Sequence, residues 1–207
     1  MTEFLKDDFE TRILAEGKYK RIIGIDEVGR GCWAGPVTVT AFIYSSDSGH
    51  VDNVTDSKKI SLKKREEVYE KLSLNNYQTL YGDIDLIDSV GIGKSVIKLI
   101  EDLCKLLNTP DTLFLIDGRF SEDFGKNTIQ VIKGDLKYYS IAAASIIAKV
   151  ERDRLMNELS LKFPGYGLEA HKGYGTKKHI DALKSLGVTE IHRKSYKPIK
   201  NFLNEAN

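Results

Sequence analysis

The sequence predicts an α/β protein in which a mixed β-sheet is flanked by helices and followed by a helical C-terminal extension. Short apolar segments rich in Ile, Val and Thr occupy the first part of the chain, as expected for strands. The later strands alternate with segments whose apolar residues have helical spacing. Beyond residue 161 the chain is basic, contains tyrosine and indicates helices and loops. This order favours a mixed sheet with an appended helical part.

The expected strands are short and mostly apolar. The first is rich in Ile, and a glycine-rich turn joins it to a second, β-branched strand. A later run with the sequence TLFLID follows Pro110 and is typical of a central strand, buried on both faces. The strands are expected at residues 19–26, 36–44, 76–83, 112–117 and 128–132.

Three helices have limits that the sequence indicates directly. Residues 61–73 and 96–107 carry apolar side chains at helical spacing, and the second of these segments stops before Pro110. Residues 140–161 are apolar all round at first and amphipathic later. The chain has 207 residues and is expected to form a single domain. Its core would span about residues 18–160, with the basic, helical part at about 161–207.

Composition excludes several classes of protein. Hydrophobic residues make up 41% and charged residues 29%, which is ordinary for a globular protein. The apolar run at 141–150 is far shorter than the ~20 residues of a membrane span, and the acidic N-terminal segment lacks the apolar stretch of a secretory signal. Cys32 and Cys104 are too few for a disulfide framework or a cysteine-rich zinc site. We therefore expect a cytoplasmic protein, monomeric and without a membrane partner.

The net charge of +1 hides an uneven distribution along the chain. Residues 133–207 hold 14 Lys and Arg against 8 Asp and Glu, a net charge of +6, which leaves −5 for residues 1–132. An acidic first part and a basic second part suit a metal site beside a surface that binds a polyanion. Two ordinarily solvated surfaces would give the same numbers, so charge alone does not decide between these readings.

Four carboxylates lie where apolar strands reach a polar edge. Asp26 and Glu27 close the first strand, Asp117 closes TLFLID, and Asp135 follows the next strand. Sites in α/β sheets form at the carboxyl ends of strands, and oxygen donors without a His or Cys cluster suit Mg²⁺ or Mn²⁺. Two such ions could activate water against a phosphodiester. The alternative is that these acids are solvated caps.

Asp26 and Glu27 raise one geometric difficulty. Adjacent side chains on a regular strand point to opposite faces, so both can serve one site only if the strand ends or twists there. The glycines at positions 29 and 31 allow a sharp departure of the backbone.

Several motifs, in order along the chain, resemble those of bacterial ribonuclease HII. The resemblance runs from about residue 18 to 200 and does not rest on one motif. The matching blocks are GIDEVGRG with AGPV at 24–37, DSKK at 56–59, LIDG at 115–118, KGD at 133–135 with SIAAASIIAKVERDR at 140–154, KGYGT at 172–176 and HRKSY at 192–196.

This resemblance implies a ribonuclease H-like fold and a metal-dependent endoribonuclease. The enzyme would cleave the RNA strand of RNA–DNA hybrids and cut 5′ to single ribonucleotides embedded in duplex DNA, leaving a 5′-phosphate and a 3′-hydroxyl. Its two Mg²⁺ or Mn²⁺ ions would be held by the acids already singled out. The catalytic and metal-binding residues implied are Asp26, Glu27, Asp117 and Asp135.

The resemblance also implies how substrate is recognised. Gly29, Arg30 and Gly31 match the segment whose backbone contacts the 2′-hydroxyl and its phosphate, and Tyr174 matches the tyrosine that stacks under the next ribose. Lysines are candidate phosphate contacts, although each one singly is more often a solvated side chain. These candidates are Lys58, Lys172, Lys177 and Lys178.

Some positions depart from the commoner pattern of that family. Cys32 and Trp33 stand where Pro-Leu is usual, and Arg119 stands where Asn is commoner. These departures put loop geometry and substrate preference in question, but they leave the four acids intact. The other readings are a nuclease of the same general fold that acts on DNA junctions, and a nucleic-acid-binding module without catalysis. His50, His171, His179 and His192 have no metal-ligand spacing among them, so zinc is not expected.

Overall fold

The computed structural model describes residues 5 and 7–205. The chain divides into two compact units. The first unit comprises residues 1–28, 39–80 and 97–150, and the second comprises residues 29–38, 81–96 and 151–207. The expectation of a single domain, with a C-terminal part from about residue 161, stays a prediction.

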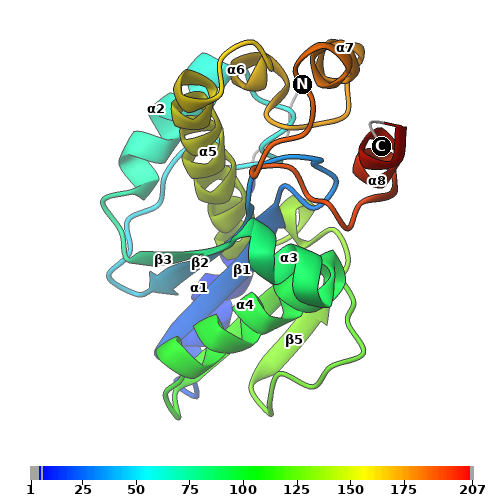
Figure 1. Cartoon of the computed structure of the whole chain (residues 1–207). Helices are drawn as coiled ribbons and strands as arrows, with labels where there is room; N and C mark the ends of the chain where they lie inside the picture. Colours follow the sequence, from blue (N-terminus) through cyan, green and yellow to red (C-terminus); the bar gives the residue numbers. More distant parts are fainter. Residues whose placement is uncertain (1–4, 6, 206–207) are drawn as a thin grey trace. The chain divides into compact units, whose positions relative to one another are not determined.

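Within the described part of the chain, the strands form a five-stranded sheet in the order β3-β2-β1-β4-β5 (Figure 1). The sheet with helices around it confirms the predicted α/β fold class, including the C-terminal helices. The strands are β1 (Arg21–Val28), β2 (Val37–Ser45), β3 (Tyr77–Gly82), β4 (Thr112–Asp117) and β5 (Thr128–Val131).

The middle of the sheet is parallel. β1 pairs with β4 in a register that ends at Ile25 opposite Ile116, and β4 pairs with β5 up to Asp117 opposite Val131. Only residues 29–36 connect β1 to its other neighbour β2, too few for a crossover, so these two strands run antiparallel. The sheet is therefore mixed, and the carboxyl ends of β1 and β4 lie side by side.

The helices account for the segments between strands and for most of the chain beyond residue 139. The three predicted with limits correspond to α2, α4 and α5. The helices are α1 (Asp8–Ala15), α2 (Leu62–Leu72), α3 (Ile84–Val90), α4 (Ile92–Leu107), the 3₁₀ turn η1 (Gly134–Leu136), α5 (Tyr139–Lys162), α6 (Leu168–His171), α7 (Lys177–Leu186) and α8 (Lys197–Glu205). None of the described helices is both long and apolar enough to cross a membrane.

Two helices were not predicted, and one begins earlier than expected. α1 is rich in charge, and α3 is a short helix whose N-cap Asp83 accepts the Leu86 N–H. Gly91 ends α3 at a positive φ of 84°, and its carbonyl then accepts the Ser95 N–H, which starts α4 at once. The expected start at residue 96 was wrong for this reason.

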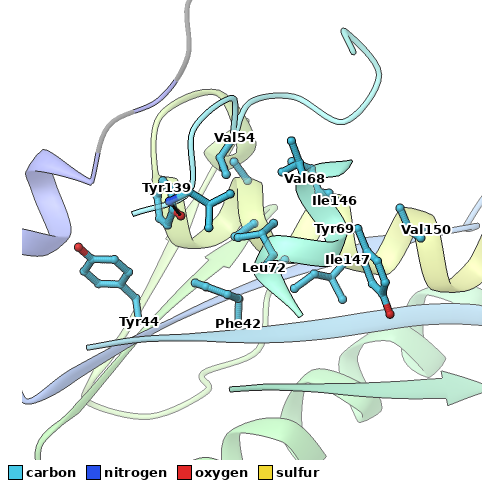
Figure 2. Close-up of a cluster of buried hydrophobic side chains, with 14 of the residues drawn as sticks. Phe42, Tyr44, Val54, Val68, Tyr69, Leu72, Tyr139, Ile146, Ile147 and Val150 are labelled. Carbon is cyan, nitrogen blue, oxygen red and sulfur yellow. Dashed lines mark hydrogen bonds between the residues drawn. The ribbon is translucent and has the colours of Figure 1, made fainter. Parts of the chain in front are cut away.

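The core of the first unit lies between β2, α2 and α5. Figure 2 shows Phe42 from the strand against Leu72 of α2 and Ile147 of α5. All three side chains are buried, at 0% exposure. Burying side chains of this size contributes about 1.5–3 kcal/mol each, so this cluster fixes α5 on the sheet.

Gly24 in β1 allows the first turn of α5 to approach the sheet closely. A Cβ at this position would lie 2.2 Å from the carbonyl carbon of Ser140 and 2.4 Å from the nitrogen of Ile141. Only glycine leaves room for this contact. The approach places the start of α5 directly against the strand that carries Asp26.

Candidate active site

Asp26 and Asp117 are brought together by the parallel register of β1 and β4. The register ends with Ile25 paired to Ile116, and these two acids follow next on the neighbouring strands. Asp26 is buried, at 8% exposure, and its carboxylate accepts a hydrogen bond from the Ser145 side chain on α5. Burial raises the pKa of Asp26 well above its ordinary value, and the charges of Glu27 and Asp117 raise it further.

Glu27 follows Asp26 inside β1, which continues to Val28 rather than ending at Asp26. The Glu27 N–H donates to Asp26 Oδ1 at 2.7 Å, so the buried carboxylate is held by the backbone of its neighbour. The turn away from the strand comes at Gly29, whose φ is +95°. Gly29 therefore releases the backbone only after Glu27, and because β1 continues through Val28, the role of Glu27 beside Asp26 in one site stays a prediction.

The KGD turn after β5 holds Asp117 and presents Asp135. The Gly134 N–H donates to Asp117 Oδ1 at 2.7 Å. A Cβ at Gly134 would come within 2.5 Å of Ile141 Cδ1, so the turn is packed tightly against α5. Lys133 enters the turn in the left-handed conformation, with a φ of 55°, which is uncommon for a residue with a side chain.

Asp135 lies in the 3₁₀ turn η1 and is half-buried. Burial raises its pKa, the charges of Asp117 and Asp56 add to the rise, and Lys58 opposes it. These electrostatic contacts join the KGD turn to the DSKK segment, which the sequence alone did not place near the acids. Asp56 is a further carboxylate at this site, and the sequence marks it only as part of the DSKK motif.

An open pocket of about 620 Å³ lies at this edge of the first unit. Asp117 and Asp135 line it together with Asp56. Exposed cations lie at the same pocket, and a polyanion could approach them. These cations are Lys58, Arg119 and Lys133.

The acids suit a hard divalent cation in their chemistry. They offer only oxygen, and the interactions of Asp26 with Glu27 and Asp117, and of Asp117 with Asp135, are repulsive between charged groups. A bound cation would relieve that repulsion. Within residues 5 and 7–205, no three His, Cys, Asp or Glu side chains already stand as a formed metal site. The chemistry of the donor set fits such a cation.

In the second unit, Tyr174 lies against the loop that contains Gly29, Arg30 and Gly31. The position of a Cβ on Gly31 would be 3.7 Å from Tyr174 Cε1. The tyrosine is 40% exposed, and its hydroxyl is hydrogen-bonded to the Cys32 thiol. The structure thus brings together two substrate-binding candidates that are more than 140 residues apart in the sequence.

The two unusual residues Cys32 and Trp33 also contact the loop that carries the tyrosine. The Gly173 carbonyl accepts the Trp33 N–H at 2.8 Å, and a Cβ at Gly175 would lie 2.1 Å from the Trp33 ring. The departure from the common pattern is therefore built into the packing of this loop.

Buried arginines organise the same loop, and the sequence reasoning gave them no role. Arg152 donates to the carbonyl oxygens of Ala34 at 3.3 Å and Pro36 at 3.0 Å, and Arg193 donates to those of Arg30 and Gly35, both at 3.0 Å. Both side chains have 0% exposure. Guanidinium groups offer five donors in a fixed fork, which suits several carbonyls at once. No spacing in the sequence marks an arginine that binds backbone oxygens.

The lysine candidates differ in their surroundings. Lys58 is exposed at the pocket with Asp117 and Asp135. Lys172 uses its ammonium within the second unit, where Nζ donates to the Glu169 carbonyl at 2.8 Å and to the Asn157 side chain. Lys178 lies 3.4 Å from the Glu169 carboxylate. Of these candidates Lys58 lies at the pocket of the acids, and its role as a phosphate contact stays a prediction.

Comparison with known proteins places these features in one family. The family model described as Ribonuclease HII matches residues 23–199. A relative named Ribonuclease HII from Leuconostoc mesenteroides is 42% identical over 199 residues, covering 95% of this chain and 77% of the relative. One of the same name from Caldicellulosiruptor bescii is 41% identical over 198 residues, covering 95% and 94%.

Solved structures show the same fold. Ribonuclease H2 from Pyrococcus horikoshii OT3 is similar with a TM-score of 0.73 and 24% identity, covering 89% of this chain and 98% of that one. Bst-RNase HIII in complex with Mn²⁺ is similar with a TM-score of 0.64 and 18% identity, covering 91% and 70%. The predicted ribonuclease H-like fold is confirmed. From the family model and the relatives above 40% identity, this chain belongs to the ribonuclease HII family, hydrolases that cleave RNA in RNA–DNA hybrids.

Proposed function

We propose that this enzyme hydrolyses the RNA strand of RNA–DNA hybrids and also cuts 5′ to single ribonucleotides embedded in duplex DNA. The observation that carries the proposal is the parallel register that sets Asp26 beside Asp117, with Asp135 held at the same edge by the KGD turn. Carboxylates gathered at one strand edge, beside exposed cations, suit a reaction on a phosphodiester.

We propose Asp26, Glu27, Asp117 and Asp135 as the residues that hold divalent cations, either Mg²⁺ or Mn²⁺. Two ions held there would supply activation of water and stabilisation of the leaving oxygen, leaving a 5′-phosphate and a 3′-hydroxyl. The similar Bst-RNase HIII was solved in complex with Mn²⁺, which supports a divalent ion of this kind. Backbone N–H groups and Ser145 orient the carboxylates before any ion binds.

Recognition of the ribose falls to the loop with Gly29, Arg30 and Gly31, and to Tyr174. Glycines let the backbone approach a 2′-hydroxyl closely, and an aromatic ring can stack against a sugar. The buried guanidiniums of Arg152 and Arg193 support this part of the proposal, because they bind carbonyl oxygens of the loop and so fix its backbone. Lys58 is proposed as a phosphate contact.

We expect the enzyme to act in the cytoplasm as a monomer on these nucleic acids. Its family membership supports a nucleic acid as the substrate. The alternatives kept open by the sequence are a nuclease of DNA junctions and a binding module without catalysis.

One experiment separates these functions. A DNA duplex with one ribonucleotide, the matched all-DNA duplex and an RNA–DNA hybrid are incubated with the protein in Mg²⁺, in Mn²⁺ or in EDTA. We expect metal-dependent cleavage of the hybrid and nicking 5′ to the single ribonucleotide. Cutting of the all-DNA duplex alone would indicate the junction nuclease, and binding without cutting would indicate the binding module.

A further inference from the structure

Three histidines that are far from metal-ligand spacing in the sequence form one buried cluster in the second unit. His171, His179 and His192 are exposed by 8%, 0% and 0%. The rings of His171 and His179 are stacked, with centroids 4.5 Å apart and 14° between their planes. His179 and His192 meet through their Nε2 atoms at 3.2 Å. Two facing ring nitrogens require one to donate and the other to accept.

The direction of that hydrogen bond follows from the partners at each end. His192 Nδ1 accepts the Thr189 N–H at 3.0 Å, so the proton of a neutral His192 ring is on Nε2. His179 Nδ1 is 3.0 Å from the Tyr174 carbonyl oxygen, which can only accept, so the proton of His179 is on Nδ1. The contacts of His192 and of His179 therefore imply the same direction: His192 donates to His179, and His179 donates to the Tyr174 carbonyl.

The neutral state of both rings has a structural cause. Burial lowers the pKa of His179 and of His192 to about 4, so neither ring carries a charge at neutral pH. The chain from Thr189 to the Tyr174 carbonyl therefore has one direction and one arrangement of protons. With only one arrangement of its protons, the hydrogen bond between His179 and His192 cannot reverse its direction, so the contact with the Tyr174 carbonyl is always made.

The end of this chain is the loop that carries the proposed ribose-stacking tyrosine. The Tyr174 carbonyl accepts both from His179 and from the Thr176 N–H at 2.8 Å, which uses its two lone pairs. His171 holds the residue before it, because its Nδ1 accepts the Gly173 N–H at 3.2 Å. Lys172 has a φ of 53° and Gly173 a φ of 87°, so the loop depends on these contacts to keep its shape.

We propose that His179 and His192 are positioning residues for ribose recognition, because their one-directional hydrogen-bond chain fixes the backbone of Tyr174. The proposal rests on the proposed role of Tyr174 in contacting the ribose. It assigns to the histidines no contact with substrate. Their loss is expected to weaken discrimination between a ribonucleotide and a deoxyribonucleotide, with little effect on the chemical step at the carboxylates.

A matched pair of substitutions isolates the bond to Tyr174. In His179→Asn the amide nitrogen takes the place of Nδ1 and keeps the donor to the Tyr174 carbonyl. In His179→Gln the amide group takes the place of Nε2 and keeps only the bond to His192. Both variants remove the imidazole ring and lose its packing to a similar degree. They differ in whether the hydrogen bond to the Tyr174 carbonyl is kept. His50→Gln changes an exposed histidine in the first unit and serves as the control.

Affinity for labelled duplexes with and without one ribonucleotide is measured in EDTA, and kcat and KM in Mg²⁺. We expect His179→Gln to lose about five- to tenfold of the affinity ratio between the two duplexes, the effect of one hydrogen bond, with kcat changed less than twofold. His179→Asn is expected to restore the ratio to within about twofold of the unaltered protein. Equal losses in the two variants would overturn the proposal.

Tyr174→Ala in the same assays separates failure of this inference from failure of the proposed function. If Tyr174→Ala keeps full discrimination, the role of the tyrosine is wrong. If it loses discrimination while His179→Gln does not, the positioning role of the histidines is wrong. Nitrogen chemical shifts of the unaltered protein add a test that needs no variant: His179 must carry its proton on Nδ1 and His192 on Nε2, and the opposite tautomers would contradict the chain.

Discussion

At the scale of single residues, Asp117 connects the parts of the candidate site. Its Oδ1 accepts the Gly134 N–H at 2.7 Å, and its charge raises the pKa values of both Asp26 and Asp135. It is also the last residue of β4, next to the pocket. We therefore expect Asp117 to bind a cation through its negative charge and to accept the Gly134 N–H through its oxygen. A substitution that removes the charge and keeps the oxygen separates these two roles.

We predict that Asp117→Asn abolishes cleavage and leaves the fold intact. The amide oxygen can still accept the Gly134 N–H, but the negative charge needed for a divalent cation is gone. The rate of hybrid cleavage in Mg²⁺ is expected to fall by about 10²–10³-fold or more. Thermal unfolding is expected to be unchanged or slightly improved, because a repulsive charge has been removed.

Asp102→Asn is the matched control for that change. Asp102 lies on α4 in an exposed pair with Lys98 at 2.9 Å, which contributes about 1 kcal/mol or less. The cleavage activity of the Asp102→Asn variant is expected to equal that of the unaltered protein. Retained cleavage by a folded Asp117→Asn enzyme would remove Asp117 from the metal-binding set.

How far the site could be predicted depends on what positions each residue. Asp26 and Asp117 could be singled out because an apolar run that is followed by a carboxylate is visible in the sequence, although β1 itself continues to Val28. Arg152 and Arg193 could not, because their partners are carbonyl oxygens and any sequence offers those. The pairing of His179 with His192 was missed for a similar reason: their 13-residue separation matches no ligand spacing, and only the fold brings the rings together.

At the scale of elements, the contact of β1 with α5 decides where the site is built. Gly24 lets the start of α5 lie against the strand, and Ser145 in the same helix reaches Asp26. The limits of β4 were predicted to the residue, because Pro110 and Asp117 bound a short apolar run. α1 and α3 escaped prediction because one is charged and the other is a single short segment that depends on its cap, Asp83.

We predict that Gly24→Ala strongly destabilises the protein. The added methyl carbon would lie 2.2 Å from a backbone atom of Ser140, so the helix itself would have to move rather than a side chain. Overpacking against the backbone is expected to lower the free energy of unfolding by about 3 kcal/mol or more, as measured by denaturant unfolding.

Gly93→Ala in α4 is the opposite case, since a Cβ there meets nothing within 4 Å. It should gain about 0.5–1 kcal/mol, as alanine does in a helix. Equal effects of the two substitutions would refute the close approach.

At the scale of the whole molecule, the two units contain different kinds of buried ionisable groups. The acids that raise one another's pKa lie in the first unit, whereas the buried guanidiniums and the neutral histidines lie in the second. The acids and the histidines thus occupy two different local environments. Each environment responds to pH in its own direction, because burial raises the pKa of a carboxyl and lowers that of an imidazole.

The pH dependence of unfolding separates those directions. The folded-state pKa of His179 and of His192 is about 4, against an ordinary value of 6.5, so the unfolded chain binds more protons between these values. The contribution of each ring is therefore fully present above about pH 6.5 and is lost as the pH falls toward 4. The raised pKa values of Asp26 and Asp135 act with the opposite slope, since their protonated forms are favoured in the fold.

The unaltered protein and the His179→Asn variant share the same carboxyls, so the difference between their free energies of unfolding cancels the contribution of those carboxyls. We predict that the stability advantage of the unaltered protein over His179→Asn shrinks by roughly 1–3 kcal/mol between pH 7 and pH 4, because the variant has lost one buried imidazole that resists protonation. Denaturant unfolding at half-unit intervals of pH measures the difference, with His50→Gln as the histidine control. His50 is exposed in the first unit and its replacement leaves the buried histidine chain in place, so this variant controls for the removal of one histidine. An advantage of His179 that stays constant from pH 7 to pH 4 would show that the ring accepts a proton in place, and the neutral hydrogen-bond chain to Tyr174 would then be wrong.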